Sequence, residues 1–336
     1  GKQLYKAFQQ FATRDTIDWF ESRGVKLKTE EDDRIFPVTD DSQTIIDCLV
    51  NEAKKLGVDI RQKADVTKLS RNEHFHLTLK NKEVLTAGQV IIATGGHPKP
   101  ESYDWLKQLG LNIIPPFPSL FTFNVPDSGL TDLQGLSVPQ GSVQIAGTKH
   151  RQEGPVLVTH WGFSGPAVIK LSAFAAKELY ERHYQFPFLI NWCGMQEEDA
   201  RQLINRYKAD HPKKYVVSNR LFAIPERLWK RLCQKATIRD DQQFGDLPKK
   251  ALNKLVEVLT KDPYEAQGKT TFKEEFVTAG GVDLNEVDVR TFESKQIPGL
   301  YLTGEVLNVD GVTGGFNFQH AWTAGYLAGM AAGKKP

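Results

Sequence analysis

The feature that most constrains the fold is an apolar run near the end of the chain that stops at a glycine and a glutamate. Residues 300–303 follow a Pro-Gly break and read as a strand buried on both faces, with Gly304 and Glu305 directly after it. In open α/β sheets, ligands bind beyond the carboxyl ends of the strands. Gly304 would let the backbone approach such a ligand, and Glu305 would offer a carboxylate to its hydroxyl groups. The pair predicts a site for a sugar or ribitol chain.

A glycine-rich loop and a helix follow this strand. Residues 308–315 contain three glycines, and Ala321, Gly325 and Ala328 then recur at the spacing of a helix that packs closely on a sheet. A helix beginning near Asn317 would direct its free N–H groups and its positive dipole end toward the loop. That end favours an anion or an electron-rich carbonyl, although a helix that only covers the sheet would show the same small residues. Strand end, loop and helix together predict a bound dinucleotide.

A second β-branched run, residues 89–94, also ends in two glycines, Gly95 and Gly96. Alone, this pattern is equally typical of a simple turn after a core strand. Beside the motif near the end of the chain, it predicts a parallel strand that stops at the same ligand-binding edge.

The middle of the chain has a different character. After Pro115, Pro116 and Pro118, separated short strands predict a largely antiparallel domain that one helix, residues 165–182, interrupts. From residue 197 to 262 the apolar pattern is helical. The sequence therefore predicts an α/β protein with three domains: a discontinuous ligand-binding domain over 1–115 and 292–336, an inserted β-domain over 116–195 and 263–291, and a helical domain over 196–262.

The composition limits the kinds of partner and the cellular compartment that we expect. The 43 basic and 41 acidic side chains give a formal charge of +2, which provides no electrostatic case for nucleic acid or an anionic membrane. No apolar segment approaches the length of a membrane span, so we expect a cytoplasmic protein. The three cysteines are far apart and form no CxxC pair, which predicts neither a disulfide framework nor a metal site.

Five motifs in order along nearly the whole chain carry a resemblance to a known family. They are residues 34–37 (RIFP), 93–96 (ATGG), 159–166 (THWGFSGP), 278–282 (TAGGV) and 302–319, from LTGE to GGFNFQ. In these motifs the chain resembles the bacterial FAD-dependent oxidoreductases of the YhiN/BaiN type, which include aminoacetone-oxidase-like enzymes. The ATGG turn is common to many flavoproteins, whereas the last motif is specific to the family.

The resemblance implies an FAD-binding, Rossmann-like domain of the two-dinucleotide-binding type that carries the inserted β-domain and helical domain. It places Gly304 and Glu305 near the pyrophosphate and ribitol, Thr94 and Gly95 on the adenosine side, and Val66 near the adenine through its backbone. It places a further set near the isoalloxazine ring: Gly314, Gly315, Phe316, Asn317, Phe318 and Gln319.

One departure from the family pattern limits the resemblance. Family members begin with a strand and a GxGxxG turn that holds the pyrophosphate, and this sequence contains no such turn. We therefore expect the chain to be part of a longer protein, and to hold FAD less tightly in the form given.

The resemblance implies hydride or two-electron transfer between a small organic substrate and FAD, with oxygen or another acceptor, or the reverse with NAD(P)H as donor. His160 and His320 are candidate general bases because histidine titrates near neutral pH, although structural roles are commoner for such residues. Two alternatives remain. One is a flavin-dependent tRNA-modifying protein with a basic face on the helical segment (Lys213, Lys214, Arg227, Lys230, Arg231, Lys235, Lys249, Lys250), which the near-neutral total charge argues against. The other is a non-catalytic flavoprotein-like scaffold.

Overall fold

The computed structural model describes residues 2–31, 33–270, 277–312 and 314–334. The chain divides into two compact units. A discontinuous unit consists of Gly1–Pro116 and Thr278–Pro336, and an inserted unit consists of Phe117–Val277. Each unit has its own cluster of buried apolar side chains. The three-domain division that the sequence suggests stays a prediction.

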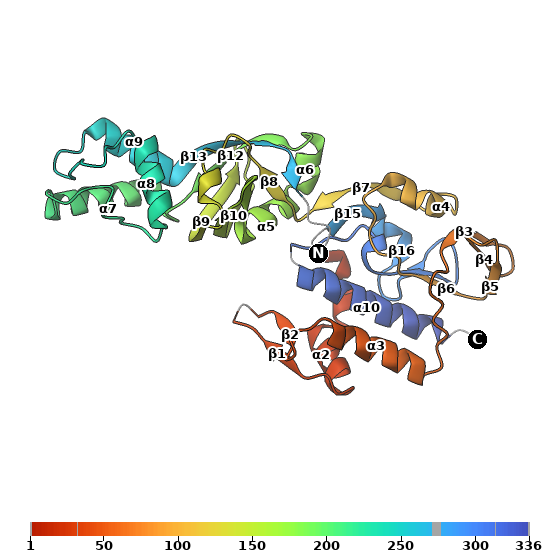
Figure 1. Cartoon of the computed structure of the whole chain (residues 1–336). Coiled ribbons are helices and arrows are strands. Elements are labelled where there is room, and N and C mark those ends of the chain that lie inside the picture. The colour runs from red at the N-terminus through yellow and green to blue at the C-terminus, as the bar shows by residue number, and fades with distance from the viewer. Residues whose placement is uncertain (1, 32, 271–276, 313, 335–336) are drawn as a thin grey trace. The chain divides into compact units, whose positions relative to one another are not determined.

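The discontinuous unit combines short helices, β-hairpins and a small mixed sheet (Figure 1). Its helices are α1 (Tyr5–Phe8), α2 (Thr13–Glu21), α3 (Gln43–Lys55), α4 (Asp104–Lys107) and α10 (Gly314–Ala332). A two-stranded hairpin joins β1 (Leu27–Thr29) to β2 (Ile35–Pro37), and a three-stranded antiparallel sheet contains β3 (Val66–Arg71), β4 (Phe75–Leu79) and β5 (Val84–Ala87).

The sheet that positions the candidate site has the order β16-β17-β18-β6. Its strands are β16 (Val287–Asp288), β17 (Glu293–Ser294), β18 (Leu300–Leu302) and β6 (Val90–Ile92). The strands β18 and β6 pair in parallel, with Leu302 opposite Ile92, which confirms the predicted parallel pairing. All three residues of β18 are fully buried, as expected for a strand covered on both faces. Within the described part of the chain β6 is the edge strand, and Ile91 is 42% exposed.

Helix α10 is the long apolar helix that the sequence predicts, but it begins at Gly314 and not near Asn317. Glycine has a low helix propensity, so the sequence favours a later start. A local hydrogen bond joins the preceding loop to the first turn: the backbone N–H of Gly311 donates to Oδ1 of Asn317 at 2.8 Å.

The inserted unit is built on a seven-stranded sheet of order β13-β12-β9-β10-β11-β8-β14, in which the neighbouring strands pair antiparallel. Its strands are β8 (Thr122–Asn124), β9 (Ser137–Ile145), β10 (Arg151–Val158), β11 (Gly162–Ser164), β12 (Gln185–Asn191), β13 (Asp262–Gln267) and β14 (Lys269–Thr270). Alternation along β13, where every second side chain is buried, gives the sheet one apolar face. The predicted antiparallel character is confirmed.

The described residues of this unit also form the α-helices α5 to α9. The helix predicted over residues 165–182 is two helices, α5 (Pro166–Phe174) and α6 (Ala176–Glu181), separated at Ala175. Three more helices lie together beyond one end of the sheet in Figure 1: α7 (Glu197–Asp210), α8 (Glu226–Lys235) and α9 (Lys249–Lys261).

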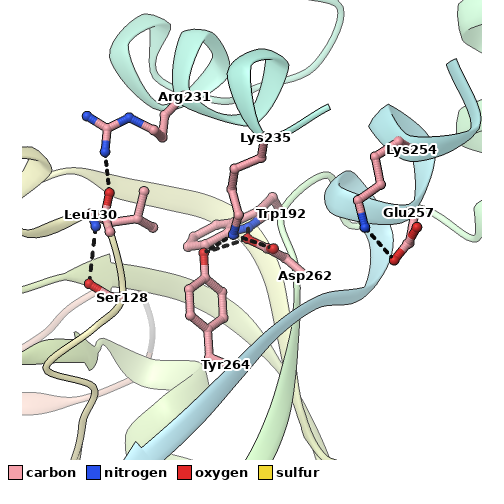
Figure 2. Close-up of polar contacts among 10 residues, drawn as sticks. Ser128, Leu130, Trp192, Arg231, Lys235, Lys254, Glu257, Asp262 and Tyr264 are labelled. Carbon is pink, nitrogen blue, oxygen red and sulfur yellow. Dashed lines mark hydrogen bonds and ion pairs between the residues drawn. The ribbon is translucent and has the colours of Figure 1, made fainter. Parts of the chain in front are cut away.

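A buried polar network fixes α8 to the start of β13 (Figure 2). Asp262 is completely buried, and its carboxylate accepts from the indole Nε1 of Trp192 at 3.0 Å and from the hydroxyl of Tyr264 at 2.5 Å. The ammonium of Lys235 lies 2.6 Å from Oδ1 of the same carboxylate. Burial, with the Asp262 charge as a second cause, raises the pKa of Tyr264 well above its usual value, so the phenol stays a donor.

The strands that connect the two units, β7 (Ile113–Ser119) and β15 (Val277–Val282), form a two-stranded sheet. Among the described residues, no helix combines the length and the apolar character needed to cross a bilayer.

Candidate functional site

The parallel pairing of β6 with β18 brings two glycine turns to one edge of the sheet. The N–H of Thr303 donates to the carbonyl of Ile92 at 2.9 Å, so the chain leaves both strands at the same level. A Cβ added to Gly96 would lie 2.9 Å from Cβ of Thr278 and 3.4 Å from the carbonyl oxygen of Glu305. Position 96 therefore needs glycine, chiefly because the Thr278 side chain on β15 leaves no room for a Cβ.

Glu305 is the acidic group at this edge. Burial raises the pKa of its carboxyl group, and a hydrogen bond from the backbone N–H of Gly96 opposes that shift. A half-buried carboxylate with one backbone donor keeps acceptor capacity for further hydrogen bonds. It is therefore suited to bind the hydroxyl groups of a ligand.

A buried tyrosine holds the turn after β6. The backbone N–H of His97 donates to the hydroxyl oxygen of Tyr103 at 2.9 Å, and Tyr103 is completely buried. Gly95 has a φ of +76°, a backbone conformation that residues other than glycine rarely adopt. Its position, and that of the exposed Thr94 beside it, is set by this turn.

The first turn of α10 opens on empty space. Gly314 and Gly315 are exposed, and a Cβ added to either would meet no atom within 4 Å. The first N–H groups of a helix have no partner within the helix, so this end presents hydrogen-bond donors and a partial positive charge. Side chains larger than glycine would fill the space in front of these donors.

The turn at Gly304, directly before Glu305, lies beside a later turn of the same helix. A Cβ on Gly304 would lie 3.6 Å from Cβ of Ala321, seven residues after Gly314. At 1.5 Å per residue, Glu305 and the open first turn are separated by about 10 Å along the helix. An extended polyhydroxy chain with a ring at one end spans a distance of this order.

The other predicted ring contacts divide into inward and outward residues. Phe316 packs on Phe8 with ring centroids 5.7 Å apart, whereas Phe318 is 63% exposed and stacks on Trp322 at 5.8 Å. The amide of Gln319 points inward: its Nε2 donates to the hydroxyls of Thr16 at 2.9 Å and Thr323 at 3.1 Å.

These inward contacts make Gln319 a link between α10 and the start of α2. Sequence reasoning missed Thr16, Tyr103 and Thr278 as members of the site. Thr16 and Thr278 are far in sequence from the residues they contact, and Tyr103 lies six residues after His97, but a single Thr or Tyr carries no local signal.

The two candidate histidines lie in different units. His320 is 1% exposed, and neither ring nitrogen forms a hydrogen bond with a described residue. Burial lowers the pKa of His320 to about 4, and the nearby Gly304 backbone opposes the shift without reaching hydrogen-bond geometry. His160 is exposed in the inserted unit, with its ring centroid 3.8 Å from that of Trp161.

Val66, the predicted adenine contact, is 38% exposed at the first position of β3. Two cavities in the described residues lie away from all these groups. One, of about 130 Å³, lies beside the start of α7 in the inserted unit, and the other, of about 300 Å³, lies between α1 and β16 in the discontinuous unit. In the described ranges, no group of three His, Cys, Asp or Glu side chains is placed to hold a metal ion.

The family model of the HI0933-like protein Rossmann domain matches residues 1–331. The chain belongs to this family. The resemblance to YhiN/BaiN-type FAD-dependent oxidoreductases is thereby confirmed, together with the mixed α/β, Rossmann-like fold class. The general class of this HI0933-like chain is that of a flavoprotein oxidoreductase.

Three curated relatives of the HI0933-like chain match over most of their length. A ribosomal RNA dihydrouridine synthase of Escherichia coli is 29% identical over 95% of this chain and 79% of its own length. A ribosomal RNA dihydrouridine synthase of Haemophilus influenzae is 27% identical over 98% and 82%. A 3-dehydro-bile acid delta(4,6)-reductase of Clostridium scindens is also 27% identical, over 98% and 82%.

The residues of this HI0933-like chain fit one part of FAD. The open space before Gly314 and Gly315, the N–H groups of these two glycines at the start of α10 and the Glu305 carboxylate suit the isoalloxazine and ribityl portions. No GxGxxG turn for the pyrophosphate occurs in the sequence, so these residues account for only part of the cofactor.

Proposed function

We propose that this chain is an FAD-dependent reductase, in which NAD(P)H is the hydride donor and a carbon–carbon double bond conjugated to a carbonyl group is the acceptor. The general class rests on the family match over residues 1–331. The reductive direction rests on the names of the relatives. Dihydrouridine is uridine reduced at a ring double bond next to a carbonyl, and a delta(4,6)-reductase of a 3-dehydro-bile acid acts on double bonds that continue from a ketone.

The observation that carries the proposal is the shared edge at which Glu305 and the first turn of α10 lie about 10 Å apart. When bound, FAD supplies the two-electron chemistry that no side chain provides. Glu305 would hold the ribityl hydroxyls, and the N–H groups of Gly314 and Gly315 would stabilise negative charge that develops on the ring. The buried imidazole of His320, whose pKa is lowered to about 4, would stay neutral.

Two substrate classes remain within this proposal. A small enone fits the relative that reduces a bile acid, and a uracil base in RNA fits the two relatives that modify ribosomal RNA. The first corresponds to the small organic substrate that the resemblance implies. The non-catalytic scaffold alternative differs from both because it predicts a protein without flavin.

The test begins with the visible spectrum of the purified full-length protein and the identity of the chromophore that heat releases. Under anaerobic conditions, NADH or NADPH should bleach the flavin, and 2-cyclohexenone or uridine-containing RNA should restore its colour. Cyclohexanone, which lacks the double bond, is the matched control and should not. Colourless protein, or a bleached flavin that neither acceptor reoxidises, would contradict the proposal.

A variant connects the chemistry with the site. Glu305→Gln keeps the size of the side chain but removes its charge, and hydrogen bonds to charged groups contribute about 1.5–3 kcal/mol. We therefore expect FAD to bind about 10- to 100-fold more weakly, as measured by fluorescence titration of the apoprotein. Unchanged affinity would remove Glu305 from the site while leaving the reductase proposal standing.

A further inference from the structure

The near-neutral total charge of the chain conceals a strong local excess of positive charge. From Glu197 to Lys261 the sequence contains 15 Lys and Arg residues against 9 Asp and Glu residues, whereas the whole chain has a net charge of only +2. The rest of the chain is therefore net negative. An asymmetry of this kind, concentrated on α7, α8, α9 and the loops between them, is typical of a surface that binds a polyanion.

The structure separates the basic residues of this segment into two sets. The first set is occupied by internal partners. Lys230 pairs with Asp240 at 3.0 Å, Arg231 with Asp132 at 2.7 Å and Lys235 with Asp262 at 2.6 Å. Arg227 donates to the carbonyl of Asp132. These residues hold the helices in place and are not available as a binding face.

The second set consists of Lys213, Lys214, Lys249 and Lys250, which we call the lysine surface. All four side chains are exposed, and none forms an ion pair with any residue that the structure describes. Half of the basic residues that the sequence suggested as one face are thus free, and these are the ones outside α8.

Backbone hydrogen bonds bring the two lysine pairs together from segments far apart in the sequence. The N–H of Phe244 donates to the carbonyl of Lys214 at 2.9 Å, and the N–H of Gly245 donates to the carbonyl of Pro212 at 2.8 Å. The N–H of Leu247 then closes a turn onto Phe244, two residues before Lys249. The side-chain ammonium of Lys208 on α7 also donates to the carbonyl of Leu247 at 2.8 Å. The lysine surface is therefore one rigidly connected feature.

The position of Lys249 and Lys250 is electrostatically unfavourable in the free protein, which favours a role in binding. They are the first two residues of α9, where the positive end of the helix dipole disfavours cations, and the helix has no acidic residue in its first turn. A bound phosphate would relieve this repulsion. The carboxylates of Asp210 and Asp246 on the same segments leave the local charge positive.

An exposed aromatic ring accompanies the charges. Tyr215, directly after Lys214, is 46% exposed, and its backbone forms a bridge with Gln243. Exposed aromatic rings beside lysines provide stacking surfaces for unpaired bases, in addition to the phosphate contacts. Neither of the two cavities described above is lined by these residues, so the surface fits an extended polyanion better than a small enclosed anion.

We propose that the lysine surface binds the phosphate backbone of an RNA, with Tyr215 stacking on an unpaired base. This rests on the proposed function in its RNA form, because a reductase that acts on uracil in RNA also needs surfaces that bind the phosphates of the polynucleotide. The near-neutral total charge disfavours nucleic acid, but the local charge of the lysine surface favours it.

The test measures RNA binding and not turnover. The probe is fluorescently labelled bacterial ribosomal RNA fragments, titrated with the full-length protein at several salt concentrations. The variant is Lys213→Gln, Lys214→Gln, Lys249→Gln and Lys250→Gln together. The matched control has the same change in charge on exposed lysines of the discontinuous unit: Lys26→Gln, Lys54→Gln, Lys68→Gln and Lys334→Gln.

The logarithm of affinity falls with the logarithm of salt by about 0.7 per phosphate contact on single strands. We expect the salt slope of the lysine-surface variant to be shallower by up to about 3, with binding at low salt weakened at least about tenfold. The control variant should bind like the unaltered protein. Equal loss in both variants, equal binding by both, or binding to phosphatidylglycerol vesicles in place of RNA would overturn the inference.

A second variant keeps the test valid if the fourfold change perturbs folding. Tyr215→Leu preserves an apolar side chain but removes the aromatic face, and should weaken binding to RNA without altering the salt slope. The reduction of 2-cyclohexenone by the same preparations separates the two proposals. If the protein is colourless and inactive but binds RNA, and the fourfold lysine variant loses that binding, the lysine surface is retained and the reductase is rejected. Active protein that never binds RNA would reject the lysine surface and retain the reductase.

Discussion

The side chain of Asp262 shows how a single buried carboxylate organises the inserted unit. It has no exposed surface and accepts from or pairs with three groups: Trp192 directly after β12, Lys235 on α8 and Tyr264 on its own strand β13 (Figure 2). Taking a carboxylate out of water is unfavourable unless every partner is present. The network is therefore expected to be sensitive to the loss of any one member.

The first prediction concerns this carboxylate. Asp262→Ala leaves the Lys235 ammonium, the indole N–H and the phenol without their acceptor, so the inserted unit should lose about 3–5 kcal/mol of unfolding free energy. Urea unfolding followed by tryptophan fluorescence measures it. The control is Lys254→Met, which removes an exposed ion pair with Glu257 at 2.9 Å and should change stability by less than about 0.5 kcal/mol. Similar effects of the two changes would contradict the network's role.

The second prediction concerns His320 and pH. Its pKa is lowered from 6.5 to about 4 by burial, so the folded state binds fewer protons than the unfolded state between these values. Stability should therefore fall as the pH decreases from 6.5 to 4, by up to about 3 kcal/mol from this group. In His320→Leu, which cannot be protonated, the acid-dependent loss should be smaller by about that amount. Thermal unfolding of both proteins between pH 7 and 4 measures the difference, and parallel curves would refute it.

At the level of elements, α10 contains a glycine in its first turn and another in its middle, and we expect different roles for the two. Gly325 lies in the middle of the helix and Gly315 in its first turn, and a Cβ on either would meet no atom within 4 Å. Neither has a positive φ. The two positions are therefore equivalent by packing, and differ only in that Gly315 lies at the proposed flavin-binding end.

The third prediction uses this pair. Replacing glycine by alanine inside a helix stabilises it by about 0.5–1 kcal/mol. Gly325→Ala should raise the thermal stability of the apoprotein and leave FAD affinity unchanged. Gly315→Ala should give a comparable or smaller stabilisation but weaken FAD binding, because its methyl group occupies the space in front of the helix donors. Equal FAD affinity in both variants would place the ring elsewhere.

For helix α3, the sequence pattern identifies the helix but does not predict how it packs. Apolar residues recur at helical spacing along it, and the structure places it at Gln43–Lys55. None of its side chains is buried, and Ile46 and Leu49 are 48% and 41% exposed. Amphipathic periodicity identified the helix, but periodicity cannot state what covers its apolar face.

For the whole molecule, the division into units has a consequence for folding. All residues of the larger buried cluster, from Phe121 to Ala266, belong to the inserted unit, which is continuous in sequence. The connecting strands β7 and β15 pair with each other, so the two crossings between the units lie side by side. The inserted unit thus has what an independent domain needs.

The fourth prediction concerns the folding of the inserted unit on its own. Residues 117–277 expressed alone should unfold cooperatively in urea, with an unfolding midpoint close to that of one of two transitions in the whole chain. Replacing the same residues by a short Gly-Ser linker should leave the discontinuous unit folded. Failure of the isolated segment to show a cooperative transition, with the whole chain unfolding in a single step, would show that the units depend on each other.

Several features could be predicted from the sequence because they depend on local patterns. The apolar runs around Ile91 and Tyr301 predict two paired strands, and glycines after each strand fix where they stop. The start of α10 was predicted near Asn317, whereas the helix begins at Gly314, because the low helix propensity of Gly314 and Gly315 favoured a later start. The basic face was predicted as one set of eight residues, and only pairing across the fold divides it.

By itself, the sequence determined the order of elements, the mixed α/β class and the motif that combines Gly304 and Glu305 with the glycines before α10. These depend on periodicity and on backbone freedom, which act over a few residues. Only the tertiary structure decided that Gly96 contacts the Glu305 turn, that Gln319 is turned toward Thr16, that His320 is buried and neutral, and that Lys213 and Lys249 lie on one surface. Those facts depend on which distant segments share a core and which charges find partners there, and hydrophobic burial acts without regard to separation along the chain.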